Sequence, residues 1–80
     1  MKNDTLQIKI KECAIKMGNN IMHIRMSKGI SLPAVSSALN TPVYVLKNIE
    51  EGKYPDVKVE LLIRLVKYYE IKMKDLFEGM

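Results

Sequence analysis

Cysteine, tryptophan and long apolar runs are almost or wholly missing from this sequence. It has one cysteine, Cys13, no tryptophan, 3 prolines and 4 glycines. A single cysteine cannot form an internal disulfide, and so little proline and glycine excludes collagen-like and linker-like chains. The longest apolar run, residues 43–46, is far shorter than the about 18 residues that span a bilayer, and no signal peptide begins the chain. We therefore expect a cytoplasmic protein with no membrane contact.

Residues suited to catalysis or to metal binding are also scarce. His23 is the only histidine, and the chain has no GxSxG or HExxH motif, no glycine-rich phosphate loop and no ligand pair at metal spacing. We expect His23 on the polar surface of a helix and Cys13 as a small buried apolar side chain. The sequence thus predicts that the protein is not an enzyme and holds no metal or cofactor.

The size and the charge of the chain narrow the remaining classes. Its 80 residues suffice for one domain, and 48% of them are hydrophobic, as in ordinary folded proteins. The 13 lysines and arginines exceed the 9 acidic residues and give a net charge of +4, which favours nucleic acid or another acidic partner. A domain this small, without disulfides, gains stability from a second subunit, so we expect a homodimer.

Five segments carry apolar residues at the spacings of three and four that indicate amphipathic helices. They are residues 13–26, 31–40, 41–51, 56–69 and 73–77. Gly29, Asn40 and Gly52 stand at the ends of the first three segments and suit the left-handed conformation that ends a helix. The sequence therefore predicts a compact all-α fold of five helices.

The starts and the buried faces of these helices can also be assigned. Ser31 is expected to cap the second helix, Thr41 followed by Pro42 to begin the third, and Asp56 to cap the fourth. The positions expected to face the core in the second and fourth helices are Val35, Ala38, Leu39, Val59, Leu62, Ile63, Val66 and Tyr69.

The beginning of the chain fits two conformations. Leu6, Ile8 and Ile10 alternate with polar residues, which suits a strand, and a lone strand would have to pair with the same segment of a second chain. Alternatively, the segment extends the first helix and aligns Leu6, Ile10 and Cys13 on one face. We favour the helix, because short alternations arise easily by chance. Residues 1–16 are assigned to an N-terminal extension and residues 17–77 to the domain.

Two short helices placed between two longer ones follow the plan of a helix-turn-helix domain. Several motifs stand in register with this plan: Arg25, Gly29-Ile30-Ser31, Val35-Ser36, Leu46 and Glu50-Glu51-Gly52, followed by Pro55, the apolar residues 61–66 and Asp75-Leu76-Phe77. On these motifs, residues 17–77 resemble the lambda-repressor-like, Cro-type (XRE family) helix-turn-helix DNA-binding domains.

The resemblance implies a site for double-stranded DNA, with the third helix as the recognition helix in the major groove. The residues that it implies are Val43, Tyr44, Lys47 and Asn48 in the groove, with Lys28 and Lys53 at phosphates. Arg25 and Glu50 would form a partly buried ion pair that orients this helix. The implied function is sequence-specific regulation of transcription, with a repressor as the expected type.

The sequence departs from the family where DNA would be met. Leu32 stands where the family commonly has a phosphate-binding glutamine, and residues 42–45 give the recognition helix an apolar start. Exposed apolar residues at a helix start often mark contacts with protein. A second hypothesis is therefore the same fold used as a protein-interaction module, antitoxin-like or an inhibitor. Its contact patch would consist of Leu32, Val43, Tyr44 and Val45.

The expected homodimer needs a surface outside the helix-turn-helix. One recognition helix reads only a few base pairs, and domains of this kind gain specificity by pairing two half-sites. Two surfaces are expected to dimerise: residues 6–10, or a closing patch of Tyr68, Leu76, Phe77 and Met80.

Overall fold

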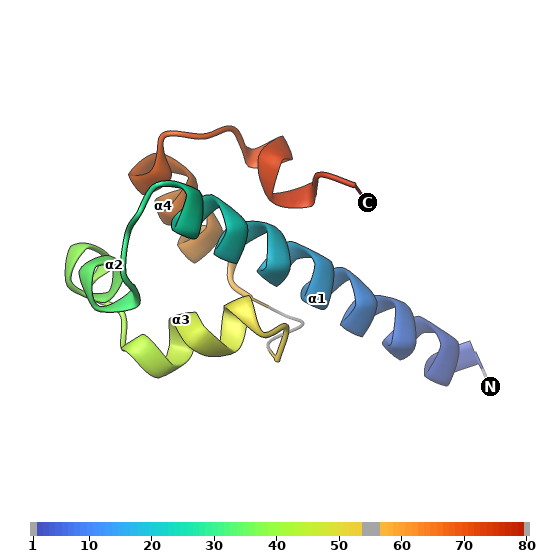
Figure 1. Cartoon of the computed structure of the whole chain (residues 1–80). Helices are drawn as coiled ribbons and strands as arrows, with labels where there is room; N and C mark the ends of the chain where they lie inside the picture. Colours follow the sequence, from blue (N-terminus) through green and yellow to red (C-terminus); the bar gives the residue numbers. More distant parts are fainter. Residues whose placement is uncertain (1, 54–56, 80) are drawn as a thin grey trace.

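Helices make up the regular structure in the computed structural model, which describes residues 2–53 and 57–79. Four α-helices, α1 (Lys2–Ser27), α2 (Leu32–Leu39), α3 (Val43–Glu50) and α4 (Val59–Tyr69), are followed by a 3-10 helix, η1 (Met73–Phe77) (Figure 1). No strand occurs in these residues, and the predicted all-α fold is confirmed for them. The last of the five expected helices is a 3-10 helix rather than an α-helix.

The longest element, α1, includes the segment for which strand and helix were both open. It continues through 26 residues, and Figure 1 shows its N-terminal half projecting beyond the other helices. Residues 2–12 are therefore helical, and the strand alternative is wrong for them. After α1, Gly29 has a left-handed φ of 66°, a conformation that glycine adopts without strain. This residue turns the chain toward α2.

The caps of α2 are the predicted ones. The hydroxyl oxygen of Ser31 accepts a hydrogen bond from the backbone N–H of Ala34 at 3.3 Å, and Asn40 has a left-handed φ of 50°. Asparagine tolerates this conformation better than most residues. The chain therefore turns at once, and only residues 40–42 separate α2 from α3.

The start of α3 differs from the prediction. Pro42 rather than Thr41 occupies the N-cap position. The Thr41 hydroxyl instead donates to the carbonyl oxygen of Leu39 at 3.1 Å, so this side chain closes the end of α2. The predicted cap of the fourth helix, Asp56, lies outside the described residues.

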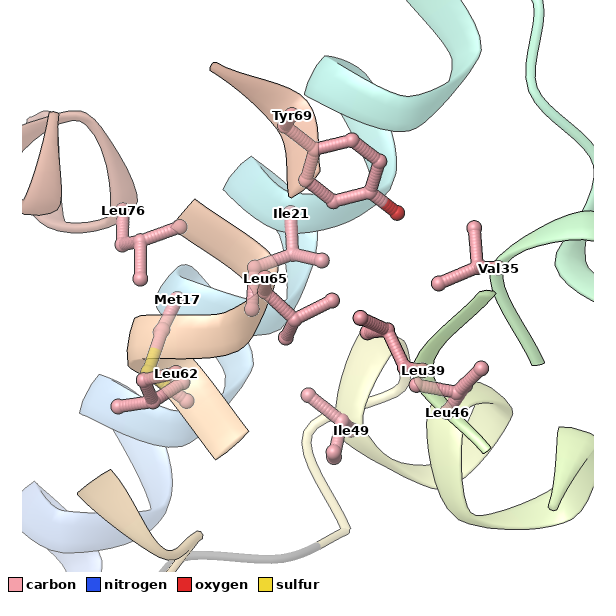
Figure 2. Packing of buried hydrophobic residues seen from close by; sticks show 10 residues of the cluster. All are labelled: Met17, Ile21, Val35, Leu39, Leu46, Ile49, Leu62, Leu65, Tyr69 and Leu76. Carbon is pink, nitrogen blue, oxygen red and sulfur yellow. The ribbon is translucent and has the colours of Figure 1, made fainter. Parts of the chain in front are cut away.

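The core lies where the C-terminal half of α1 meets the other helices, and Figure 2 shows side chains from all five elements in it. The buried cluster consists of Met17, Ile21, Val35, Leu39, Leu46, Ile49, Leu62, Leu65, Tyr69 and Leu76. Burying one such apolar side chain contributes about 1.5–3 kcal/mol relative to leaving it exposed. Each element supplies at least one member, so the cluster joins all of them.

Three positions predicted to face the core are exposed instead: Ala38, Val59 and Ile63. In α4 the buried residues are Leu62, Leu65 and Tyr69, which follow one another at spacings of three and four. Successive helical residues are rotated by about 100°, so this stripe turns Ile63 toward the surface. Leu65 was missed because two apolar stripes compete in this helix.

The element η1 is fastened to the C-terminal half of α1. The side-chain amide of Asn20 donates to the carbonyl oxygens of Leu76 and Glu78, both at 2.9 Å. Leu76 itself is 0% exposed. The prediction that Leu76 belongs to a dimerising patch is therefore wrong, because its side chain already fills the core. Met80, another member of that patch, lies outside the described residues.

Cys13 and His23 differ in how well their surroundings were predicted. His23 is exposed, as expected for the polar side of a helix. Cys13 is also exposed, so the expectation that it is buried is wrong. The reason is its position in the projecting half of α1, immediately before Ala14, which is the first buried residue among those of this helix whose side chains the structure describes.

Candidate nucleic-acid interface

Helix α3 has one buried face and one exposed face. Its inner residues Leu46, Ile49 and Glu50 are buried. On the outer face, Tyr44 keeps 65% of its surface exposed, and Lys47 is exposed as well. These two residues are three positions apart and therefore share a face. The helix can present this face to a partner while its inner face stays in the core.

The C-terminal end of α3 rests on α1 through backbone contacts at two glycines. A Cβ atom at the buried Gly18 would lie 2.2 Å from the carbonyl oxygen of Ile49 and 2.8 Å from that of Glu50. Gly52 has a left-handed φ of 74°, and a Cβ atom there would lie 2.6 Å from Cα of Ile15. Gly18 was not predicted from the sequence, although a lone glycine inside a helical pattern is a signal of close packing.

The structure brings Arg25 of α1 and Glu50 of α3 together in a bidentate ion pair. Nε of Arg25 lies 2.6 Å from Oε2 of Glu50, and Nη2 lies 3.0 Å from Oε1. Nη1 donates to the carbonyl oxygen of Ile30 at 2.8 Å. The hydrogen bond to Glu50 raises the pKa of Arg25, although burial of the guanidinium acts in the opposite direction. One side chain thus links α1, α3 and the connection before α2.

Tyr69 lies in the core close to this ion pair. Burial, together with the negative charge of Glu50, raises the pKa of Tyr69 to about 12, while the charge of Arg25 acts to lower it. Only 2% of Tyr69 is exposed. The phenol is therefore held neutral, which keeps a second negative charge away from Glu50.

A second arginine holds the junction between α2 and α3. The guanidinium of Arg64, in α4, donates a hydrogen bond to the carbonyl oxygen of Leu39, which also accepts from the Thr41 hydroxyl. The last carbonyl groups of a helix have no partner within the helix, and a cation suits this end of the helix dipole. Arg64 was not predicted as a functional residue, because its contact joins residues far apart in the chain.

The predicted DNA-binding residues do not all lie on one surface. Lys53 is exposed, and its Nζ lies 3.2 Å from Oε1 of Glu51. Asn48 is half-buried and takes part in a further interaction. Lys28 is exposed in the connection between α1 and α2, which Figure 1 shows apart from α3. The structure thus brings Val43, Tyr44 and Lys47 together with Asn48 at their edge, and separates Lys28 from them.

The predicted protein-contact patch is smaller in the structure than in the sequence. Leu32 and Val45 are half-buried and pack against the core cluster. Val43 is 38% exposed and Tyr44 65% exposed. The apolar surface at the start of α3 is therefore formed mainly by Val43 and Tyr44.

No three side chains of histidine, cysteine, aspartate or glutamate within residues 2–53 and 57–79 are grouped so that they could hold a metal ion. Over the same residues, no helix has both the length and the apolar character needed to cross a membrane.

Comparisons of the chain with known protein families, with curated proteins and with solved structures find no match.

Proposed function

We propose that the protein binds double-stranded DNA through α3 and regulates transcription in a sequence-specific manner. In this proposal it is a helix-turn-helix protein of the lambda-repressor-like, Cro type (XRE family), with repression as the expected effect. The observation that carries the proposal is the division of α3 into a buried face and an exposed face with Tyr44 and Lys47. The major groove is about 12 Å wide and admits a helix presented in this way.

The exposed side chains of α3 suggest how the bases and phosphates would be contacted. Lys47 supplies charge for a phosphate or for the acceptors of guanine, and the Tyr44 hydroxyl can bond a phosphate or a base edge. Val43 can pack on a thymine methyl group. Asn48, at the edge of this surface, has the amide geometry that pairs with adenine.

The contacts behind α3 support the same function. A recognition helix reads bases only if its position is held within a fraction of an ångström. The ion pair of Arg25 with Glu50 and the backbone contact at Gly18 both hold the C-terminal end of α3. Pairing with Arg25 also compensates the charge of Glu50, which would otherwise repel phosphates.

The proposal is tested by measuring binding of the purified protein to its own upstream DNA and to DNA selected from a random pool, at two salt concentrations. Lys47→Ala should weaken binding and reduce the salt slope by about one. Asn48→Ala should cost about 1–3 kcal/mol and relax the preference at one base pair. The control is Lys67→Ala, which removes an exposed lysine from the last turn of α4 and should bind like the parent at the same salt.

DNA binding is refuted if no selected sequence binds above the non-specific level. It is also refuted if the Tyr44→Ala, Lys47→Ala and Asn48→Ala variants all bind as the parent does.

One observation favours a second candidate function. Val43 and Tyr44 form an exposed apolar surface at the start of α3, and Lys53, beyond the other end of this helix, is already paired with Glu51. This composition suits a protein-interaction module of the antitoxin or inhibitor type. Under this alternative, Tyr44→Ala abolishes capture of a protein partner, whereas Lys47→Ala has little effect and salt dependence is weak.

The proposed regulator acts as a homodimer that pairs two DNA half-sites. Domains of this kind read half-sites about 34 Å apart, one turn of DNA. Because Leu76 is buried in the core, residues 6–10 are favoured as the dimer surface over the closing patch that included Leu76.

A further inference from the structure

Helix α1 is longer than the part of the molecule that covers it. This part, called the body below, consists of α2, α3, α4 and η1 (Figure 1). The molecule measures 42 by 24 by 20 Å, and a helix of 26 residues is about 39 Å long. The long dimension is therefore set by α1, whose N-terminal half projects beyond the other helices in Figure 1.

One apolar stripe runs along α1 through both halves. Leu6, Ile10, Ala14, Met17 and Ile21 follow one another at steps of three and four, so they lie on one face of the helix. Leu6 and Ile10 are 58% and 40% exposed, whereas the other three are 4%, 7% and 2% exposed. The same face is covered from Ala14 onward and exposed at Leu6 and Ile10.

The chain exposes more surface than a compact monomer of its mass. A compact monomer of 9.2 kDa exposes about 4,900 Å². This chain exposes 5627 Å², an excess of about 700 Å². In a specific interface of standard size, each partner contributes about 800 Å². The radius of gyration leads to the same conclusion, because it is 12.8 Å where a compact chain of this length has about 11.6 Å.

We propose that the N-terminal half of α1 packs against the same segment of a second copy of this chain, with the two helices antiparallel and centred on Leu6 and Ile10. An isologous pair needs only one stripe that complements itself. Twice this excess, about 1,400 Å², is the upper limit of the area that two copies can bury, and it reaches the range of specific interfaces. The proposal supplies the dimer surface that the proposed function calls for, and its test requires no DNA.

The antiparallel direction follows from the position of the body. From Ala14 onward, the other helices of the same chain occupy the face that the stripe uses. A parallel partner would run into this body. An antiparallel partner instead carries its own body beyond the N-terminus of the first copy, so both bodies find room.

Sedimentation of the full chain from low to high micromolar concentration tests the pairing. The wild type should dimerise, and Ile10→Asp should raise the dimer dissociation constant by about tenfold or more, because a carboxylate would be buried without a partner. The matched control is Ile8→Asp, since Ile8 is 57% exposed but two residues away, about 200° around the helix. This variant should dimerise within about twofold of the wild type.

Circular dichroism melts separate loss of pairing from loss of folding. Neither Ile8 nor Ile10 belongs to the buried cluster, so both variants should keep the folded body. The proposal is overturned if the wild type stays monomeric, or if Ile8→Asp disrupts the dimer as much as Ile10→Asp does. Dimerisation without any DNA binding would leave this surface in place and refute only the proposed function.

The single cysteine reports the direction of pairing. In a parallel pair the two Cys13 residues would face each other, and mild oxidation would link them. In the antiparallel pair centred on Leu6 and Ile10, the two Cys13 residues lie toward opposite ends of the contact. They are then too far apart to form a disulfide, so the dimer should stay unlinked. Rapid formation of a Cys13 disulfide dimer would overturn the antiparallel arrangement.

Discussion

The two halves of α1 have similar apolar stripes and opposite surroundings. Leu6 and Ile10 in the N-terminal half are exposed, while Met17 and Ile21 continue the same stripe in the C-terminal half and are buried. The stripe thus shows which face of a helix needs cover, but not what supplies it. Within this chain, the stripe of α1 is buried only where the other helices pack against it.

What distinguishes the C-terminal half is a set of residues that are not apolar. Gly18 allows backbone contact with α3, Asn20 binds the carbonyl oxygens near η1, and Arg25 binds Glu50. Among the side chains that the structure describes at residues 6 and 8–13, none forms a hydrogen bond or an ion pair with another element. Specific contacts, rather than apolar content, therefore mark the half that belongs to the body.

The largest expected effect is that of Gly18→Ala. The added methyl group would meet the backbone of α3 at 2.2 Å, so we expect the free energy of unfolding to fall by about 3 kcal/mol or more. In a helix without such a contact, the same change stabilises by about 0.5–1 kcal/mol. Chemical denaturation distinguishes the two cases, because the free energy of unfolding falls if Gly18 contacts α3 and rises if it does not. The neighbouring control Asn19→Ala, at an exposed position, should change stability by less than about 0.5 kcal/mol.

The comparison of the two halves is sharpened by making one substitution in both. Ile21→Ala should lower the free energy of unfolding by about 2–4 kcal/mol, because it opens a cavity in the core. Ile10→Ala should change it by less than about 0.5 kcal/mol at protein concentrations low enough for the monomer. Equal effects in thermal or chemical denaturation would contradict the division of α1 into a covered and a bare half.

Breaking the ion pair should have a smaller effect. Glu50→Gln leaves the guanidinium of Arg25 partly buried without its counter-charge, and we expect a loss of about 2 kcal/mol. The control is the adjacent Glu51→Gln, because Glu51 pairs with Lys53 at the surface and contributes little. If the two variants melt together, the Arg25 pair does not hold α3.

The smallest effect concerns pH. Because burial raises the pKa of Tyr69 to about 12, above the value of about 10 in an unfolded chain, the folded state favours the neutral phenol. This contribution to stability is complete below pH 10 or so and is lost as the pH rises toward 12. Denaturation across this range should show a shallower decline for Tyr69→Phe than for the wild type. An identical decline would place the phenol outside the core.

The local features of the fold followed from the sequence. Ser31 and Asn40 cap α2 as predicted, because a cap depends on residues within a few positions of one another. The apolar spacing of residues 13–26 also predicted the amphipathic helix whose buried face includes Met17 and Ile21. Ile63 was misplaced, because two apolar stripes in α4 fit a helix equally well and only the position of the neighbouring helices decides between them.

The contacts between distant segments were predicted less well. Gly18, Arg64 and Asn20 act on partners that lie 25 or more residues away, and the pattern around each of them says nothing about those partners. The pairing of Arg25 with Glu50 was expected only through the resemblance to a family. The exposed face of α3 could be predicted both from the residue spacing and from the family resemblance. The spacing separates Tyr44 and Lys47 from Leu46 and Ile49.

Closure of the core by η1 bears on how this chain acquires its fold while it is being made. Asn20 cannot form its two hydrogen bonds until Leu76 and Glu78, 56 and 58 residues further along the chain, have been synthesised. Leu76 itself fills a place between α1 and α4. Until residues 76–78 have left the ribosome, the site of Leu76 stays open to water. A chain stalled before this point would display an apolar opening of the kind that chaperones bind.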